Sequence, residues 1–302
     1  MNQQKQEDLL RLQDKENKMK YCVSTYSFGR YMDSLGIYGV IDKAAEMGFD
    51  GVEFVAMDWM NGLTDEDLKK VGQYTRDKGL ETVDLCVGAD FLNGSNGDVE
   101  EEIKNVCAYV DKAALLGVKM MRHDIGRAPI GRKHGIGYAY NLERMAYACK
   151  KITEYAQTKG IMTMTENHGY YSQDADRIAS LIDAVDHDNF GVLLDLGNFM
   201  CADEDPVLSA SRLVPYTVHV HCKDFLYKKG NEINPGATWF TSRGGNYLRG
   251  AIIGHGEAKI AQSLSILKNS GYDGYISIEF EGVEDNLYGI ALGLENVKRF
   301  VM

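Results

Sequence analysis

The sequence is short of positive charge, and it contains no long apolar run. Its 302 residues include 44 acidic but only 33 basic side chains, which gives a formal net charge of −11. Nucleic-acid and anionic-membrane binders need an electropositive surface, so this balance disfavours both kinds of partner. No apolar segment approaches the roughly 18 residues that a membrane-spanning helix needs. With 44% hydrophobic and 25% charged residues, the composition is typical of a folded cytoplasmic enzyme.

Two further absences concern export and redox chemistry. Residues 1–18 are rich in Gln, Lys, Glu and Asp and lack the apolar core of a signal peptide. We therefore expect a polar tail or an exposed helix there, and a cytoplasmic location for the chain. None of the six cysteines belongs to a Cys-x-x-Cys pair, so we expect buried free thiols in a reducing compartment.

A helix-ending glycine followed by a short apolar run recurs along the chain, at Gly48, Gly79, Gly117, Gly160 and Gly271. Glycine adopts the left-handed conformation that ends a helix cheaply, so the run after it is the next strand. Helix-period patterns lie between the strands, over residues 37–47, 65–78, 99–116, 142–159 and 175–185. With residues 21–25 as the first strand, eight strand–helix units predict a single-domain (β/α)8 barrel over residues 19–302.

A doubly wound open sheet is the rival architecture. It is disfavoured because no Gly-x-Gly-x-x-Gly fingerprint follows an early strand. The connections at residues 126–137 and 231–256 are long and follow the carboxyl ends of strands. Long loops there are usually lids or binding loops, and the alternative is that they are surface decorations or contacts of a homo-oligomer.

Four predicted strands end on a side chain that can bind a metal. The apolar runs 161–166, 190–195, 216–221 and 275–279 close on Glu166, Asp195, His221 and Glu279. Parallel α/β folds gather such strand ends on one face, where catalysis occurs. One such acid alone would more simply cap a helix or pair with an arginine. Four at successive strand ends favour a site for one divalent cation, Mn²⁺ first, with Zn²⁺, Mg²⁺ and Co²⁺ as alternatives.

The chain resembles a known group of barrels through a set of short motifs. These are Glu166-Asn-His168-Gly, Asp195-Leu-Gly-Asn198-Phe, His219-Val-His221-Cys-Lys223-Asp224, Gly254-His-Gly256 and Gly271-Tyr-Asp-Gly-Tyr-Ile-Ser-Ile-Glu279. Together they are similar to the xylose isomerase-like barrel superfamily, which includes sugar-phosphate isomerases and epimerases, ketose 3-epimerases, inosose dehydratases and endonuclease IV. The resemblance covers roughly residues 20 to 300.

The resemblance implies a role for each strand-end residue. Glu166, Asp195, His221 and Glu279 would hold the metal, and in the ketose epimerases the two glutamates of this set also move protons. A glutamate that binds the metal through one oxygen keeps the other free as a base. The residue three after the aspartate is commonly histidine in the epimerases, whereas here it is Asn198.

The predicted function is isomerisation or epimerisation of a small sugar, polyol or sugar phosphate, by proton transfer through a metal-stabilised enediolate. A dehydratase or lyase acting on a keto-polyol is the alternative with the same site. An abasic-site endonuclease is disfavoured because the chain is acidic and has only seven histidines. A catalytically silent sugar-binding protein is a further alternative.

Six residues near the strand ends are predicted to contact substrate: Lys223, His168, His123, His255, Asn198 and Glu53. Alternatively, Lys223 forms an ion pair with Asp224 or with another strand-end acid. Glu53 could instead support a histidine. His219 is predicted to be a core histidine. Four arginines are candidate phosphate clamps or surface charges: Arg127, Arg132, Arg243 and Arg249.

Overall fold

Eight parallel strands close into a barrel in the computed structural model, which describes residues 19–302. In the order of pairing around the barrel they are β1 (Lys20–Ser24), β11 (Tyr275–Ile278), β7 (Thr217–Cys222), β6 (Phe190–Asp195), β5 (Met162–Glu166), β4 (Met120–His123), β3 (Glu81–Val87) and β2 (Gly51–Val55). The predicted (β/α)8 barrel is confirmed. The tail or helix predicted for residues 1–18 lies outside the described residues.

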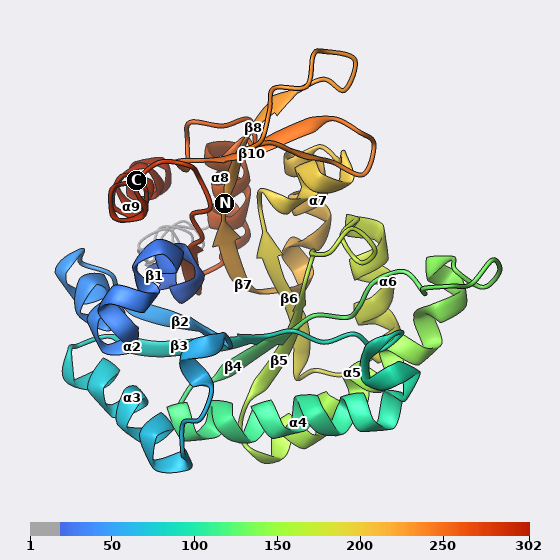
Figure 1. The fold of residues 1–302 in the computed structure, drawn as a ribbon, viewed down its shortest axis with the longest axis horizontal. Helices are drawn as coiled ribbons and strands as arrows, with labels where there is room; N and C mark the ends of the chain where they lie inside the picture. The colour runs from blue at the N-terminus through green and yellow to red at the C-terminus, as the bar shows by residue number, and fades with distance from the viewer. Residues whose placement is uncertain (1–18) are drawn as a thin grey trace, which may run out of the picture.

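The helices surround the barrel, as Figure 1 shows. They are α2 (Gly29–Glu46), α3 (Asp65–Asp77), α4 (Val99–Leu116), α5 (Tyr138–Thr158), α6 (Ala175–Val185), α7 (Pro206–Leu213), α8 (Ile260–Ser270) and α9 (Asn286–Val301). Short 3₁₀ turns are η1 (Thr25–Phe28), η2 (Asp58–Met60), η3 (Gly94–Gly97), η4 (Asn198–Ala202) and η5 (Val214–Tyr216). Among the helices of residues 19–302, none has the length and apolar character that crossing a bilayer requires.

Local signals explain where several helices begin and end. Thr64 and Asp67 form a capping box at the start of α3, and Asp98 accepts two backbone N–H bonds at the start of α4. Gly117 ends α4 at φ 81°, a conformation that a β-carbon disfavours. Helix α2 begins at Gly29, earlier than the predicted residue 37, and is kinked at Gly36, where φ is 60°.

A second, three-stranded sheet elaborates one connection of the barrel. Strands β8 (Asp224–Lys228), β9 (Phe240–Thr241) and β10 (Tyr247–Ala251) pair antiparallel in the order β8-β10-β9. The sheet lies at the top of Figure 1, and its strands β9 and β10 fall within the long connection predicted at residues 231–256, which β8 precedes. Strand β8 begins two residues after β7 ends, so this sheet starts at the carboxyl end of the barrel.

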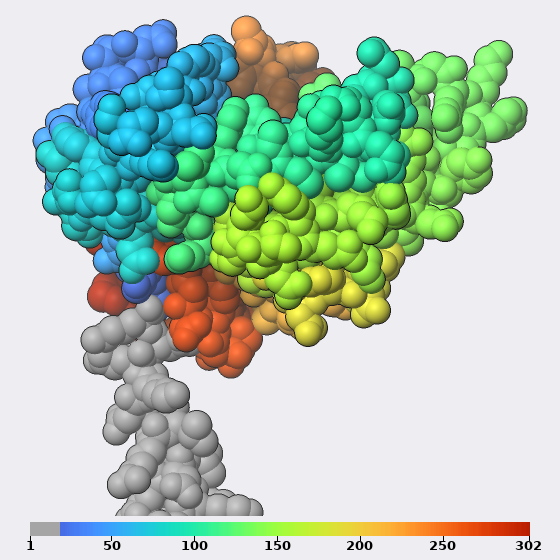
Figure 2. All heavy atoms as spheres, turned by 90° about the horizontal axis from the view of Figure 1, so that it is seen from below, coloured from blue at the N-terminus to red at the C-terminus, as the bar shows by residue number. Residues whose placement is uncertain are grey.

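The apolar core lies mainly between the barrel and its helices, whereas the barrel interior becomes polar toward its carboxyl end. Inside the barrel, Cys86, Met164 and Leu193 form a small separate cluster of buried side chains. Five of the six cysteines are buried, Cys107 is partly buried, and all six are free, as expected. Figure 2 shows that the segment before α5, green in that view, projects from the body, as a long surface loop would.

Candidate metal centre

The four strand-end residues that the sequence singles out meet at one point. One ligand atom from each of Glu166, Asp195, His221 and Glu279 lies within 4.8 Å of the others, and all four residues are buried. Glu166 and Asp195 end β5 and β6, and Glu279 directly follows β11. Asp195 and His221 are partners in the register of β6 and β7. Strand ends from four consecutive positions around the barrel therefore form one polar cluster.

The turn after β6 orients Asp195. Its Oδ1 accepts hydrogen bonds from the backbone N–H groups of Gly197 (2.8 Å) and Asn198 (2.9 Å). A β-carbon at position 197 would lie 2.4 Å from the carbonyl oxygen of Lys223, so only glycine lets the turn pack against the end of β7. These contacts leave Oδ2 of Asp195 directed at the cluster.

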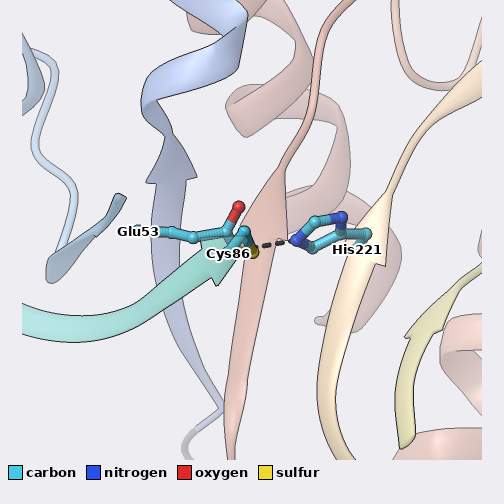
Figure 3. Close-up of side chains that lie close together, drawn as sticks. All are labelled: Glu53, Cys86 and His221. Carbon is cyan, nitrogen blue, oxygen red and sulfur yellow. Dashed lines mark hydrogen bonds and ion pairs between the residues drawn. The ribbon is translucent and has the colours of Figure 1, made fainter. Parts of the chain in front are cut away.

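Glu53, on strand β2, fixes the ring of His221 on strand β7. Oε2 of Glu53 lies 2.7 Å from Nε2 of His221, a contact drawn in Figure 3, where Glu53 and Cys86 both point toward the ring. The other nitrogen, Nδ1, faces Oε2 of Glu279 at 3.3 Å and oxygens of Glu166 and Asp195 at 3.8 Å. Burial opposes a charged ring, but Glu53 and Glu279 raise the pKa of His221 well above its ordinary value.

Both oxygens of Glu166 are already hydrogen-bonded. Arg122 donates to Oε2 through Nε (2.8 Å) and also through Nη2, and Asn198 Nδ2 donates to Oε1 at 2.9 Å. Although burial acts the other way, Arg122 and then His221 hold the pKa of Glu166 below its ordinary value. Arg122 therefore already donates to an oxygen of Glu166 that was expected to serve as a base, and the proton-transfer role of Glu166 stays a prediction.

Lys223 forms ion pairs inside the cluster. Its Nζ lies 2.6 Å from Oε2 of Glu279 and 3.3 Å from Oδ2 of Asp195. Despite burial, Lys223 and then His221 hold the pKa of Glu279 well below its ordinary value. Of the two pairings considered from sequence, the one with another strand-end acid is present. Asp224 instead accepts backbone N–H groups of the 254–258 segment.

The donor set fits a divalent cation. Among the described residues, Oδ2 of Asp195 and Nδ1 of His221 form no hydrogen bond although both are buried. Burial, opposed by Lys223 but assisted by Glu166 and Glu279, raises the pKa of Asp195 to about 7. Three carboxylates and one imidazole thus face a common point, although Arg122 and Lys223 already pair with some of the acids. A cation at that point would add a ligand bond to the two atoms that lack a hydrogen bond and would reduce the repulsion among the acids.

Arg122 and Asp124 are parts of the site that the sequence argument missed. Arg122 Nη2 lies 3.2 Å from Oδ1 of Asp124, and the same oxygen lies 3.0 Å from Nδ1 of His168. His168 is about half exposed, and no hydrogen bond to its Nε2 is found within residues 19–302. Arg122 lies on β4 with its side chain facing into the barrel, and the alternation of side chains along that strand was the sequence signal that could have identified it.

His123 and His255 lie away from the cluster. His123 is fully buried, its ring packs near Phe91 and Phe190, and its Nδ1 lies 3.0 Å from the carbonyl oxygen of Asp124. Burial lowers its pKa to about 4. It faces outward because Arg122, one residue earlier, faces inward. His255 is exposed, and within the described residues no hydrogen bond or ion pair joins its side chain to the cluster.

Two of the candidate phosphate clamps have partners elsewhere. Arg243 pairs with Asp174, and Arg249 lies over the ring of Trp239 at 5.6 Å. Arg127 and Arg132 are exposed on the projecting segment before α5. None of these four arginines contacts the cluster within the part of the chain that the structure describes.

The comparisons with known proteins agree on the architecture. The family model described as xylose isomerase-like TIM barrel matches residues 41–300. Among solved structures, a probable 3-DHS dehydratase from Bacillus anthracis superposes with a TM-score of 0.71 at 20% identity, covering 93% of this chain and 99% of that one. A D-allulose 3-epimerase from Methylomonas sp. gives 0.70 at 17% identity, covering 94% and 98%. At these identities the two structures show the fold alone.

Curated relatives share one printed name, inosose dehydratase. The protein from Clostridium perfringens is 26% identical over 140 residues, which are 45% of this chain and 46% of the relative. The match thus spans about half the length of that relative. The protein from Clostridium botulinum is 26% identical over 219 residues, covering 68% of this chain and 72% of the relative.

Proposed function

We propose that this chain, which belongs to the xylose isomerase-like TIM barrel family, is a divalent-metal-dependent dehydratase of a small polyhydroxy ketone. The barrel of residues 19–302 would be its catalytic domain. The proposal takes up one of the two activities that the sequence left open. It is supported by the name shared among the curated relatives and, independently, by the state of the two glutamates in the cluster.

The observation that carries the proposal is the asymmetry between Glu166 and Glu279. Epimerisation by two bases needs a basic carboxylate oxygen on each side of the substrate, and hydrogen bonds from Arg122 and Asn198 to both oxygens of Glu166 make this carboxylate less basic. Glu279 has one oxygen, Oε2, beside Lys223 and His221, whereas its Oε1 makes no hydrogen bond within the described residues. A single base suits the removal of one proton beside a ketone.

The metal would be held by Glu166, Asp195, His221 and Glu279, with Mn²⁺ as first choice for this oxygen-rich donor set. When bound, such an ion supplies positive charge that polarises a ketone and favours loss of the neighbouring proton. Arg122 and Glu53 would orient two of the ligands through the contacts described above.

The remaining steps fall to side chains around the cluster. Glu279 would remove the proton through Oε1, and the ammonium group of Lys223 beside it would stabilise negative charge that develops on a substrate oxygen. The departing hydroxide needs a proton. His168, held at Nδ1 by Asp124, presents Nε2 as the donor.

Incubating the purified protein with Mn²⁺ and a panel of keto-inositols and open-chain ketoses tests this function. We expect a product lighter than its substrate by one water, detected by mass spectrometry. A product of unchanged mass with altered configuration or carbonyl position would instead identify an isomerase or epimerase. No conversion of any panel member with Mn²⁺, Co²⁺, Mg²⁺ or Zn²⁺ would count against both activities.

Glu53 gives a prediction that does not depend on the substrate. Glu53→Gln keeps an oxygen that accepts from Nε2 of His221 but removes the negative charge behind the ring. Loss of such a carboxylate partner typically weakens metal binding about 10- to 100-fold. Titration with Mn²⁺, followed by the electron paramagnetic resonance signal of the free ion, measures this change. Glu81→Gln, on the exposed start of β3, is the matched control, and equal affinities in the two variants would contradict the role.

A further inference from the structure

A second group of ligand-type side chains lies inside the barrel, below the candidate metal centre. It consists of Glu53 from β2, Asp84 from β3 and His219 from β7, and one ligand atom of each lies within 4.8 Å of the others. All three side chains are fully buried. His219 precedes His221 by two residues on the same strand, so the group lies one layer deeper in the barrel.

The contacts within this group leave several atoms without partners. Nε2 of His219 lies 3.0 Å from Oε2 of Glu53 and 3.8 Å from Oδ1 of Asp84. Among the described residues, Oε1 of Glu53 and Oδ1 of Asp84 form no hydrogen bond. Buried carboxylate oxygens without a partner are costly, so an unpaired oxygen on each of two neighbouring acids points to a missing positive group.

The surrounding protein supplies little compensating charge. Within residues 19–302 neither Glu53 nor Asp84 has a lysine or arginine at ion-pair distance, and their ion-pair partners are His219 and His221. If Nδ1 of His221 binds the cation of the candidate metal centre, the imidazole ring of His221 is neutral. Two carboxylates would then face at most one imidazolium, which leaves a net negative charge in a low-dielectric interior.

We propose that Glu53, Asp84 and His219 hold a second divalent cation, of the zinc class, inside the barrel beneath the candidate metal centre. The candidate metal centre of Glu166, Asp195, His221 and Glu279, called the upper centre below, affects this site only because its cation would bind Nδ1 of His221. The second ion would be structural, because no substrate reaches three fully buried side chains.

The donor geometry favours zinc over a harder ion. A tetrahedral zinc with ligand distances of about 2.0–2.2 Å places its ligand atoms roughly 3.3–3.6 Å apart. The separation of 3.8 Å between Nε2 of His219 and Oδ1 of Asp84, an oxygen without a hydrogen bond, is close to that range. The thiol of Cys86 lies 3.4 Å from Oδ2 of Asp84 and is a fourth donor close to the three. Calcium and magnesium need more oxygen ligands than this layer offers.

A proton is the competing occupant. Burial and then Glu53 raise the pKa of Asp84 well above its ordinary value, which favours a proton on Asp84 where no cation is bound. The two occupants differ in a countable way, because a bound metal adds one equivalent per chain and a proton adds none.

Metal counting on five proteins, one of them a control variant, tests the proposal. Each is dialysed against buffered Zn²⁺ and analysed by inductively coupled plasma mass spectrometry. We expect two equivalents in the unmodified chain, one in Asp84→Asn, one in Asp195→Asn, and none in the double variant. Asp186→Asn, an exposed residue at the end of α6, is the control and should keep two. If only the upper centre fails to bind metal, Asp195→Asn will hold as much zinc as the unmodified chain. If the proposed second site is wrong, Asp84→Asn will hold as much zinc as the unmodified chain.

Anomalous diffraction at the zinc absorption edge locates the ions without any substitution, so the test survives a variant that does not fold. We expect two peaks in crystals of the unmodified chain grown with Zn²⁺, the lower one between Glu53, Asp84 and His219. A single peak at the upper centre, with one equivalent in solution, overturns the proposal and assigns a proton to Asp84.

Discussion

Replacing Asp195 by asparagine is expected to remove the divalent cation from the candidate centre and to lower turnover by ~10³-fold or more. Asparagine keeps a carbonyl oxygen for the backbone N–H groups of Gly197 and Asn198, so the turn after β6 should survive. It loses the charge of Oδ2, which faces His221 and Lys223. The kinetic loss follows because a bound metal supplies several kcal/mol of charge stabilisation in the transition state.

Four measurements on this variant separate chemistry from folding. Metal content and turnover are compared with those of Asp186→Asn, which changes the same atoms on an exposed helix end. Circular dichroism and thermal unfolding check that the barrel persists. Asp195→Asn with unchanged Mn²⁺ affinity and near-normal turnover would remove Asp195 from the ligand set, and with it the proposed centre.

Glu279→Gln is expected to lower turnover by about 10²- to 10⁴-fold, the usual contribution of a positioned general base. The amide keeps an oxygen beside the cluster but accepts no proton. The same change at Glu166 should act differently, because Arg122 and Asn198 already occupy both oxygens of that carboxylate. Its effect should fall mainly on metal affinity, since it removes a charged ligand and leaves Asp124 as the ion-pair partner of the buried Arg122 guanidinium.

Hydrogen exchange distinguishes these two glutamates. The substrate is incubated in D₂O with saturating metal, and deuterium entering the carbon beside the ketone is followed by nuclear magnetic resonance. We expect exchange to vanish in Glu279→Gln and to persist at a reduced rate in Glu166→Gln. Glu257→Gln, an exposed side chain outside the cluster, is the control. The reverse pattern, with exchange lost only in Glu166→Gln, would exchange the proposed roles.

The barrel and the four converging residues were accessible from the sequence because their signals are local. A glycine ends each of several helices, a short apolar run follows, and a charged or imidazole side chain closes four of those runs. Parallel strands in a closed barrel place such ends on one face, so local pattern and fold together bring Glu166, Asp195, His221 and Glu279 into one cluster.

Only the fold decided which side chains at the end of a short strand face into the barrel. Strand β4 has four residues, and the sequence predicted a substrate contact for His123, whereas Arg122 is the residue that contacts the cluster in the structure. A shift of one position reverses the face of every side chain on a strand. The short run from Met120 to His123 is too brief for apolar alternation to settle which face is buried.

The partners of the charged groups were also beyond the sequence. Glu53 and His221 are 168 positions apart, and Arg122 and Glu166 are 44 apart, so each contact exists only because the barrel closes with a particular register. Local composition names which side chains end the strands, and this alone gave the candidate ligands. The groups that donate to Glu166, the nitrogen of His221 that faces the acids and the acids that pair with Lys223 all depend on that long-range geometry. Electrostatic contacts act over a few ångströms in space, whatever the separation along the chain.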